Sequence, residues 1–225
     1  MKYCAKEIHV TYLILSDSHG RPDLVKEAVK RTRPDGIVFC GDGLRDFTYG
    51  ELSAVVQGFP LWAVRGNCDW LSSPLIIGGS VYEPENELLF RPENIPMLVT
   101  HGHLYGAKSG LGGLISHAAT LGAQAVIFGH THNPLELRVT PDSSYGLAAP
   151  YPMTLFNPGS LGDRGDFGTL TVRGGQFLIG HGSLKEAKKK PPRVSGTVFP
   201  PVCHRSAVTK SSSASISVSA ASSAS

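Results

Sequence analysis

The chain has 225 residues, of which 41% are hydrophobic and 17% are charged, and its formal net charge is +3. This length predicts one sizeable folded domain, with or without a tail, and the apolar content is sufficient for a core. The four cysteines form no CxxC pair, which argues against a disulfide framework and a thiolate zinc site and favours a reducing, cytoplasmic location. Apolar runs of membrane-spanning length are absent from the sequence, so we expect no membrane partner.

The charge is distributed unevenly along the chain. Residues 185–225 contain seven basic residues and one acidic residue, so the 184 residues before them carry a net charge of −3. Because clustered Lys and Arg side chains hold phosphate backbones, this acidic body predicts no nucleic-acid partner. The last fifteen residues include nine serines and too little apolar surface to offset the entropy of ordering. We therefore expect a folded domain at residues 1–184 and a disordered tail at residues 185–225.

Strand and helix patterns alternate in the first third of the chain. The expected elements are strands at 12–16, 36–40 and 61–64 and helices at 22–33 and 51–58. The strands are short apolar runs, whereas the first helix has helical spacing of its apolar residues and a proline, Pro22, in its first turn. This alternation predicts a βαβ arrangement with parallel strands.

The pattern changes after residue 75. Between residues 76 and 100, Gly, Pro and Asn divide the chain into short apolar runs, as in hairpins. Further strands are expected at 125–128, 135–139, 153–156 and 169–180, with the one later helix at 110–122. Parallel strands followed by hairpins predict an α/β fold in which two packed sheets form a sandwich flanked by helices.

Five of the apolar runs end in a polar cluster. In chain order the clusters are SDSHG, CGD, RGNCD, THGH and FGHTHNP. Their glycines allow the backbone to approach a ligand closely. Because sites in open sheets form beyond the carboxyl ends of the strands, we expect the five clusters to converge on one edge.

The side chains in these clusters suit a two-metal centre that activates a water for attack on phosphorus. Asp17 and His19, two residues apart on an extended chain, should project to the same side and share one ion. His130 and His132 could each turn toward a different ion. Oxygen and nitrogen donors without thiolates fit manganese, iron, zinc, cobalt or nickel and do not select among them.

The five motifs, in this order and spacing, resemble the signatures of calcineurin-like metallophosphoesterases. RGNCD, THGHLYG and NPGS further resemble the YfcE-type small phosphodiesterases, and the resemblance covers roughly residues 11 to 180. The resemblance implies the metallophosphoesterase fold and two bound divalent metal ions, with manganese expected first. It also implies an enzyme that hydrolyses small phosphodiesters by attack of a metal-bridging water or hydroxide. The implied ligands are Asp17, His19 and His132 for one ion, Asn67, His101 and His130 for the other, and Asp42 as the bridge.

Other residues of the motifs are candidates for supporting roles. His103 is expected to lie beside the substrate or behind a ligand, with a plain structural role as the alternative. Asp69 would orient a histidine or cap the following turn, and the NPGS segment at 157–160 would form a structural turn. Cys68 stands where many metallophosphoesterases have a histidine that protonates the leaving group. A thiol beside two cations tends toward the thiolate, and a thiolate cannot donate a proton. We therefore expect Cys68 to be a buried packing residue and not the general acid.

Two alternative functions stay open. The same fold serves as a protein-binding scaffold in a retromer subunit whose metal site is degenerate, whereas all seven ligand positions here carry competent donors. Related enzymes are nucleases, but the acidic body and the lack of an interleaved aromatic and basic patch argue against that activity. The physiological substrate and the oligomeric state, including a homo-oligomer, are left open by the sequence.

Overall fold

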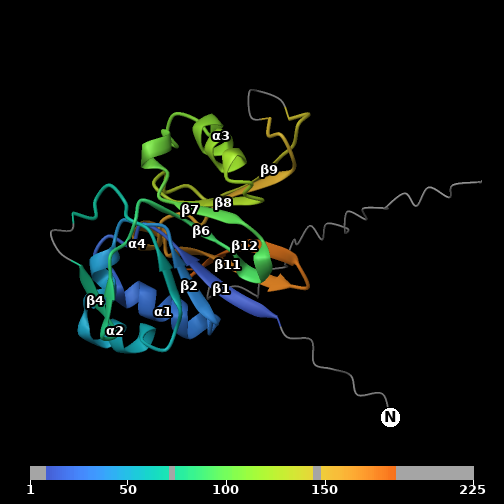
Figure 1. The fold of residues 1–225 in the computed structure, drawn as a ribbon. Helices are drawn as coiled ribbons and strands as arrows, with labels where there is room; N and C mark the ends of the chain where they lie inside the picture. The colour runs from blue at the N-terminus through green and yellow to red at the C-terminus, as the bar shows by residue number, and fades with distance from the viewer. Residues whose placement is uncertain (1–8, 71–73, 144–147, 186–225) are drawn as a thin grey trace, which may run out of the picture.

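The computed structural model describes residues 9–70, 74–143 and 148–185, and Figure 1 shows how their helices and strands are arranged. The predicted tail lies outside the described residues apart from Lys185, so its disorder stays a prediction. Within the described part of the chain, no helix is long and apolar enough to cross a membrane.

The first sheet has five strands in the order β12-β11-β1-β2-β3. These are β1 (Val10–Leu15), β2 (Gly36–Phe39), β3 (Leu61–Ala63), β11 (Asp166–Arg173) and β12 (Gln176–Ser183). Strands β1, β2 and β3 are parallel, and β11 pairs antiparallel with both β1 and β12. The predicted βαβ arrangement is therefore present, and the final hairpin returns to the side of the first strand.

The second sheet also has five strands, in the order β6-β7-β8-β10-β9. These are β6 (Glu87–Phe90), β7 (Met97–Thr100), β8 (Ala125–Phe128), β9 (Leu135–Val139) and β10 (Met153–Asn157). Its three central strands are parallel, and both edge strands are antiparallel to their neighbours. A separate hairpin joins β4 (Leu75–Ile77) to β5 (Ser80–Tyr82).

Four α-helices accompany the sheets: α1 (Pro22–Thr32), α2 (Gly50–Val56), α3 (Gly112–Thr120) and α4 (Leu161–Arg164). Short 3-10 segments are η1 (Leu44–Thr48), η2 (Pro92–Asn94) and η3 (His103–Tyr105). The prediction of a single later helix is wrong, because α4 follows α3. A helix of four residues is too short to display helical periodicity in the sequence.

The sheets and helices form four layers. Leu13 and Leu15 of β1 pack with α1 and α2 in one apolar cluster, whereas Ile14 faces the second sheet in another. On β8, Val126 belongs to a third cluster, which includes residues of α3. In Figure 1, α1 and α2 accordingly lie beside the first sheet and α3 beside the second. Alternation along buried strands thus produces the predicted two-sheet sandwich flanked by helices.

Candidate metal centre

The polar clusters that follow five strands come together at one edge of the sandwich. Asp17 and His19 follow β1, and the next two parallel strands contribute Asp42 and Asn67. The second sheet supplies imidazoles: His101 follows β7, and His130 and His132 follow β8. The distances below show how closely these side chains approach one another.

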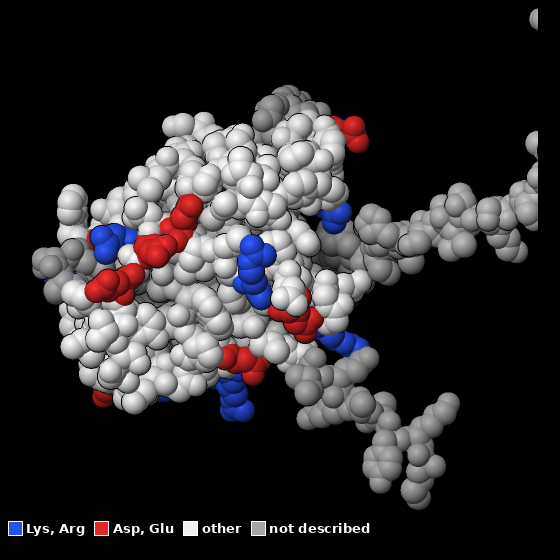
Figure 2. Space-filling model, viewed as in Figure 1, with Lys and Arg blue, Asp and Glu red and all other residues white. Residues whose placement is uncertain are grey.

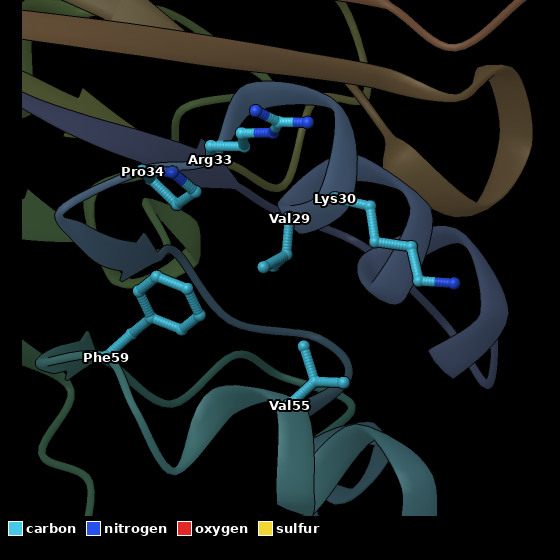
Figure 3. A pocket seen from close by; sticks show the side chains of 6 residues that line it. All are labelled: Val29, Lys30, Arg33, Pro34, Val55 and Phe59. Atoms are coloured by element: carbon cyan, nitrogen blue, oxygen red, sulfur yellow. The ribbon is translucent and has the colours of Figure 1, made fainter.

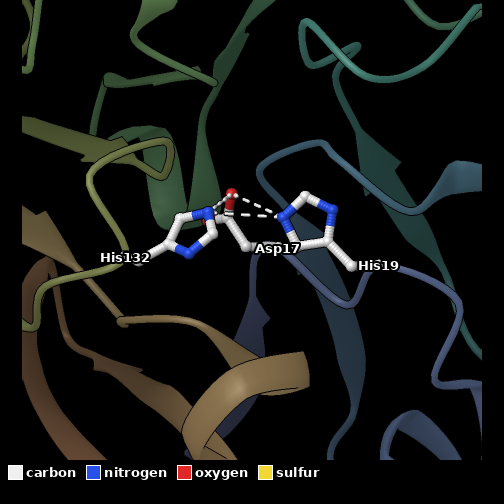
Figure 4. A group of neighbouring side chains, drawn as sticks. All are labelled: Asp17, His19 and His132. Carbon is white, nitrogen blue, oxygen red and sulfur yellow. Dashed lines mark hydrogen bonds and ion pairs between the residues drawn. The ribbon is translucent and has the colours of Figure 1, made fainter.

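The first group consists of Asp17, His19 and His132 (Figure 4). Oδ1 of Asp17 lies 3.2 Å from Nε2 of His132 and 3.8 Å from Nε2 of His19. The two Nε2 atoms are 3.3 Å apart. Oδ1 is buried and has no hydrogen-bond partner among the described residues, so the three donor atoms face a common point. This arrangement fits a divalent cation.

The carboxylate of Asp17 is fixed through its other oxygen. Oδ2 accepts hydrogen bonds from Oγ of Ser16 at 2.6 Å and from the backbone N–H of His130 at 3.2 Å. Burial raises the pKa of Asp17 above its usual value. A cation at Oδ1 would favour the ionised form, so the orientation and the desolvation of this group both suit metal binding.

The second group is organised around His101. Nδ1 of His101 lies 2.7 Å from the backbone oxygen of Cys40 and so carries the proton as a donor. Its Nε2 is directed at Oδ1 of Asn67, 3.1 Å away, and at Oδ2 of Asp42, 3.3 Å away. The His130 ring lies 5.0 Å from the His101 ring, centroid to centroid. Desolvation lowers the pKa of His130 to about 4, which leaves a neutral imidazole at neutral pH.

Asp42 lies between the two groups. Its carboxylate forms one potential metal-binding set with Asp17 and His101, and another with His19 and Cys68, with the donor atoms of each set within 4.8 Å of one another. Burial alone would raise the pKa of Asp42, but hydrogen bonds from His101 and from the backbone of Cys68 keep it well below its usual value. Asp42 therefore occupies the position that a bridging ligand requires.

Asp69 lies behind Asp42 and binds backbone. Its two oxygens accept hydrogen bonds from the backbone N–H groups of Asp42, Gly43, Leu44 and Gly66, at 2.7 to 2.9 Å. These bonds join the loop after β2 to the loop after β3. Asp69 thus fixes the position of Asp42 through the backbone, and the side chain itself is almost fully buried.

His103 lies at the border of the second group. Its ring centroid is 5.4 Å from that of His101 and 6.1 Å from that of His130. Nδ1 of His103 is buried and has no hydrogen-bond partner within residues 9–70, 74–143 and 148–185, and burial lowers the pKa of this imidazole. An imidazole that is neutral and has a free ring nitrogen is available to a ligand bound beside it.

The backbone of the candidate ligands adopts an unusual conformation. Eight described residues other than glycine have a positive φ. Five of them are candidate ligands: Asp17, His19, Asp42, His130 and His132. The prediction that the first two lie on an extended chain is wrong, because φ is 54° at Asp17 and 44° at His19. Such conformations cost about 1–3 kcal/mol each and persist where surrounding bonds enforce them.

The loops after β1 and β2 supply some of those bonds. The N–H of Asp17 donates to the oxygen of Gly41 at 3.0 Å, and that of His19 donates to the oxygen of Asp42 at 3.2 Å. The loop after β3 also packs tightly against Asp42. Residue 66 must be glycine there, because a Cβ would lie 2.1 Å from Oδ1 of Asp42. The side chains are thus aimed by tight turns that pack backbone against backbone.

Asp163 was not singled out from the sequence, and Ser160 was predicted only as part of the NPGS turn. Oδ2 of Asp163 lies 2.6 Å from Nδ1 of His132. Oγ of Ser160 accepts from the N–H of Asp163 at 3.1 Å as the cap of α4 and donates to the backbone oxygen of Asp17 at 3.1 Å. The Ser-x-x-Asp spacing of a helix start was the available signal. The NPGS segment therefore connects α4 to the first group.

Cys68 is exposed, so the expectation of a buried packing role is wrong. Its backbone N–H donates to Oδ1 of Asp42 at 2.7 Å, and its Sγ accepts from Nδ2 of Asn67 at 3.3 Å. The thiol, although exposed, stays at the site, because its Sγ lies within 4.8 Å of donor atoms of His19 and Asp42. Burial raises the pKa of this thiol, and so does the carboxylate of Asp42.

Comparison with known proteins gives one family. The model of the calcineurin-like phosphoesterase superfamily domain matches residues 10–174. The probable metallophosphoesterase YsnB of Bacillus subtilis is 34% identical over 122 residues, which cover 53% of this chain and 63% of the relative. The match thus spans less than two thirds of that protein.

Two solved structures share the fold at low sequence identity. A protein from Streptococcus pneumoniae described as a predicted phosphoesterase has a TM-score of 0.58 and 20% identity, over 78% of this chain and 90% of its own. Vacuolar protein sorting 29 from Cryptosporidium parvum has a TM-score of 0.61 and 14% identity, over 81% of this chain and 95% of its own. Both likenesses concern the arrangement of the backbone.

Proposed function

The chain belongs to the calcineurin-like phosphoesterase superfamily, and from this premise we propose that it is a metal-dependent phosphodiesterase acting on small phosphodiesters. The observation that carries the proposal is the buried Oδ1 of Asp17, which faces two imidazole nitrogens and has no hydrogen-bond partner in the part of the chain that the structure describes. A carboxylate oxygen left unpaired in the interior is costly unless a cation binds it.

The proposed centre holds two divalent cations, with manganese expected first and zinc, iron, nickel or cobalt as alternatives. The residues that would hold them are Asp17, His19 and His132 on one side, Asn67, His101 and His130 on the other, and Asp42 between them. Bound there, the cations would supply charge for the phosphate oxygens and lower the pKa of a bound water.

The remaining tasks fall to the chain itself. The hydrogen bond from Nδ1 of His101 to Cys40 keeps Nε2 of that histidine free for a ligand. Asp69 holds the loop of Asp42 in place. His103, whose Nδ1 has no hydrogen-bond partner among the described residues, is proposed to hydrogen-bond the substrate, and it is the first suspect should a side chain prove to protonate the leaving oxygen.

A substrate screen tests this proposal. The purified protein is reconstituted with each candidate metal, its metal content is measured by elemental analysis, and it is assayed with phosphomonoesters, cyclic nucleotides and linear diesters. We expect hydrolysis of linear diesters with two metals per chain. Hydrolysis confined to monoesters would contradict the diester specificity, and a metal-free, inactive protein would contradict the proposal as a whole.

The same screen addresses the two alternative functions. A scaffold of the retromer-subunit type would bind metal without hydrolysing any ester. A nuclease would hydrolyse oligonucleotides in preference to small diesters. On the face shown in Figure 2, the Lys and Arg side chains of the described residues are interspersed with acidic ones, which disfavours a phosphate backbone as the ligand of that face.

The finer assignments also belong to the proposal. Membership of the YfcE-type group rests on the RGNCD, THGHLYG and NPGS motifs. A reducing, cytoplasmic compartment is supported by the free thiols of Cys40 and Cys68. The net charge of the first 184 residues, −3, is consistent with a small-molecule substrate in place of nucleic acid.

A further inference from the structure

His132 is held from behind by a carboxylate on the helix that follows β10. Nδ1 of His132 lies 2.6 Å from Oδ2 of Asp163, in the first turn of α4. Nε2 of the same ring is directed at Oδ1 of Asp17, 3.2 Å away. The imidazole therefore lies between an outer carboxylate and a candidate metal position.

This contact has a chemical consequence for His132. A carboxylate accepts the Nδ1 proton, which fixes the tautomer that leaves Nε2 with a free lone pair. The negative charge behind the ring also makes Nε2 a stronger donor to a metal. The Asp163 carboxylate thus both aims and strengthens this ligand.

Capping of α4 does not require the Asp163 carboxylate. The cap bond to Oγ of Ser160 comes from the backbone N–H of Asp163. Lys185 also binds the backbone of this residue, since its Nζ donates to the Asp163 carbonyl oxygen at 2.9 Å. Both bonds persist if the side chain is shortened, so the carboxylate is available to serve the histidine.

The histidine at the centre of the second group has no carboxylate behind its ring among the described residues. The acceptor for Nδ1 of His101 is the neutral backbone oxygen of Cys40. Asn67, its neighbour in that group, is an uncharged donor, whereas the first group contains the Asp17 carboxylate. The Asp42 carboxylate is shared between the two groups. Among the described residues, the carboxylates that the proposed assignment gives to one group alone, Asp17 as a ligand and Asp163 behind His132, both belong to the first group.

We propose that Asp163 is a positioning residue that makes the Asp17, His19 and His132 site the tighter of the two metal sites, so that this site fills first. The inference rests on the proposed function, since it requires that both sites bind metal. It adds a residue and an order of filling that neither the motifs nor the family match assigns.

Metal titration tests the order of filling. Metal-free protein is titrated with cobalt, followed by visible absorption, and with zinc in competition with a chromophoric chelator. The proteins are wild type, Asp163→Ala, Asp163→Asn and the control Asp166→Asn. Asp166 lies close by in sequence and pairs with Arg164 at 2.7 Å, so the control removes a similar charge without touching a histidine ligand.

We expect the Asp163→Ala substitution to weaken the tighter step by about 10- to 100-fold, the usual effect of losing an outer partner of a metal-bound histidine. The weaker step should not change. Asp163→Asn keeps an oxygen that accepts the Nδ1 proton but lacks the charge, so its affinity should be intermediate. Asp166→Asn should match wild type in both steps.

A second measurement separates positioning from general support of the fold. Nitrogen shifts of the imidazole rings in the metal-free protein, recorded by NMR, report the tautomer of His132. We expect the Nδ1-protonated form in wild type and Asp163→Asn, and a mixture of tautomers in Asp163→Ala. Loss of helix α4 would alter neighbouring backbone signals in addition, whereas loss of positioning alone would not.

The outcomes are distinguishable. Wild type with two metals and unchanged affinities in both Asp163 variants overturns the inference and leaves the proposed function standing. Wild type that binds no metal overturns the proposed function. If Asp163→Ala does not fold, the Asp163→Asn variant decides the question. Its amide has the same size as the carboxylate, so an unchanged affinity of the tighter step in this variant would contradict the role of the charge.

Discussion

The parallel strands of the first sheet end in two different environments. At their carboxyl ends lie candidate metal ligands that are directed at one another, with Asp17 and Asp42 buried and His19 and Asn67 exposed. At their amino ends, α1 and α2 border an open pocket of about 470 Å³. It is lined by Val29, Lys30, Arg33, Pro34, Val55 and Phe59. In Figure 3 the apolar side chains among these point toward a common centre.

Left-handed backbone occurs at both ends but for different reasons. At the amino ends, Arg33 has a φ of 47° and closes α1, because its N–H donates to the oxygen of Val29 at 2.9 Å. At the carboxyl ends, the same conformation aims donor side chains such as Asp17 and His132. A positive φ thus terminates a helix in one place and orients a ligand in the other. The two uses differ in what the residue contacts: Arg33 bonds to the helix through its backbone N–H, whereas Asp17 and His132 direct their side chains at each other.

The largest effect is expected from Asp42→Asn, which should lower turnover by more than about 100-fold, because even outer partners of metal ligands have effects of up to that size. Asp42 belongs to two of the three potential metal-binding sets among the described residues. The melting temperature of the metal-free protein should also fall, because the lowered pKa of Asp42 means that its ionised form stabilises the folded state at neutral pH. Steady-state kinetics, elemental analysis and thermal unfolding measure the three quantities.

The matched variant at the amino ends is Val29→Ala. Val29 is buried in the cluster between α1 and the first sheet, so its truncation should cost about 1–3 kcal/mol of unfolding free energy. Turnover per folded molecule and metal content should stay the same. If Asp42→Asn kept full turnover and two bound metals, a substitution at the carboxyl ends would affect catalysis no more than one at the amino ends.

Gly66 and Gly58, on either side of β3, allow the same substitution at both ends. A Cβ at Gly66 would lie 2.1 Å from Oδ1 and 2.5 Å from the backbone nitrogen of Asp42, whereas one at Gly58 would meet nothing within 4 Å. We expect Gly66→Ala to destabilise the fold by about 1–3 kcal/mol, as overpacking does, and to lower metal affinity. Gly58→Ala should be neutral or stabilising by up to about 1 kcal/mol.

Chemical denaturation and metal titration of the two glycine variants measure these effects. Equal stability of Gly66→Ala and Gly58→Ala would show that the loop after β3 can move away from Asp42. In that event the backbone at the carboxyl ends could shift to accept a side chain. The two ends of the strands would then differ in their polar and apolar residues and not in how tightly the backbone is packed.

A smaller effect is expected from the exposed thiol at the carboxyl ends. The raised pKa of the Cys68 thiol makes it a weak acid, so turnover of diesters should fall steeply as the pKa of the leaving group rises. Cys68→His should accelerate alkyl diesters by about 100-fold, the lower end of the usual effect of general acid catalysis, and Cys68→Ser should not. A series of diesters of graded leaving-group pKa measures this slope. A flat slope in wild type would point to His103 as the proton donor.

The sequence predicted the layers and the edge of the site because both depend on simple patterns. Alternating burial in short apolar runs such as β1 and β8 gives two faces to each strand, and polar clusters after them mark the carboxyl ends. These patterns are local and repeat in several strands, so single errors in element bounds do not alter the fold. The family resemblance then assigned roles to residues that the patterns had only grouped.

The rest depended on contacts between distant segments. The left-handed turns at Asp17 and His19 are enforced by backbone bonds to the loop after β2, and no local pattern specifies such bonds. The role of Asp163 arises because α4 is brought against the loop of His132, 31 residues earlier in the chain. The exposure of Cys68 follows from the direction of one turn. Tertiary contacts of this kind are not encoded in spacing.

The smallest effect is expected from removal of residues 186–225. The described residues before that point already attach the chain to α1 and to the turn after α4. Nη1 of Arg31, in the last turn of α1, donates to the backbone oxygens of Ser183 and Leu184 at 3.2 and 3.3 Å. The N–H of Leu184 donates to Gly165, after α4, at 2.8 Å. A cut after Lys185 retains all of these bonds.

The truncated protein should therefore keep its metal content, its turnover of small diesters and its melting temperature to within about 2 °C, which corresponds to less than about 1 kcal/mol for a domain of this size. A longer truncation from Ser183 onward is the control, because it removes the bonds to Arg31 and Gly165 and should lower the melting temperature. If the shorter truncation lowered it as much as the longer one, residues beyond 185 would contribute to the packed structure. The attachment of the chain to α1 and to the turn after α4 would then extend beyond Leu184 and Lys185.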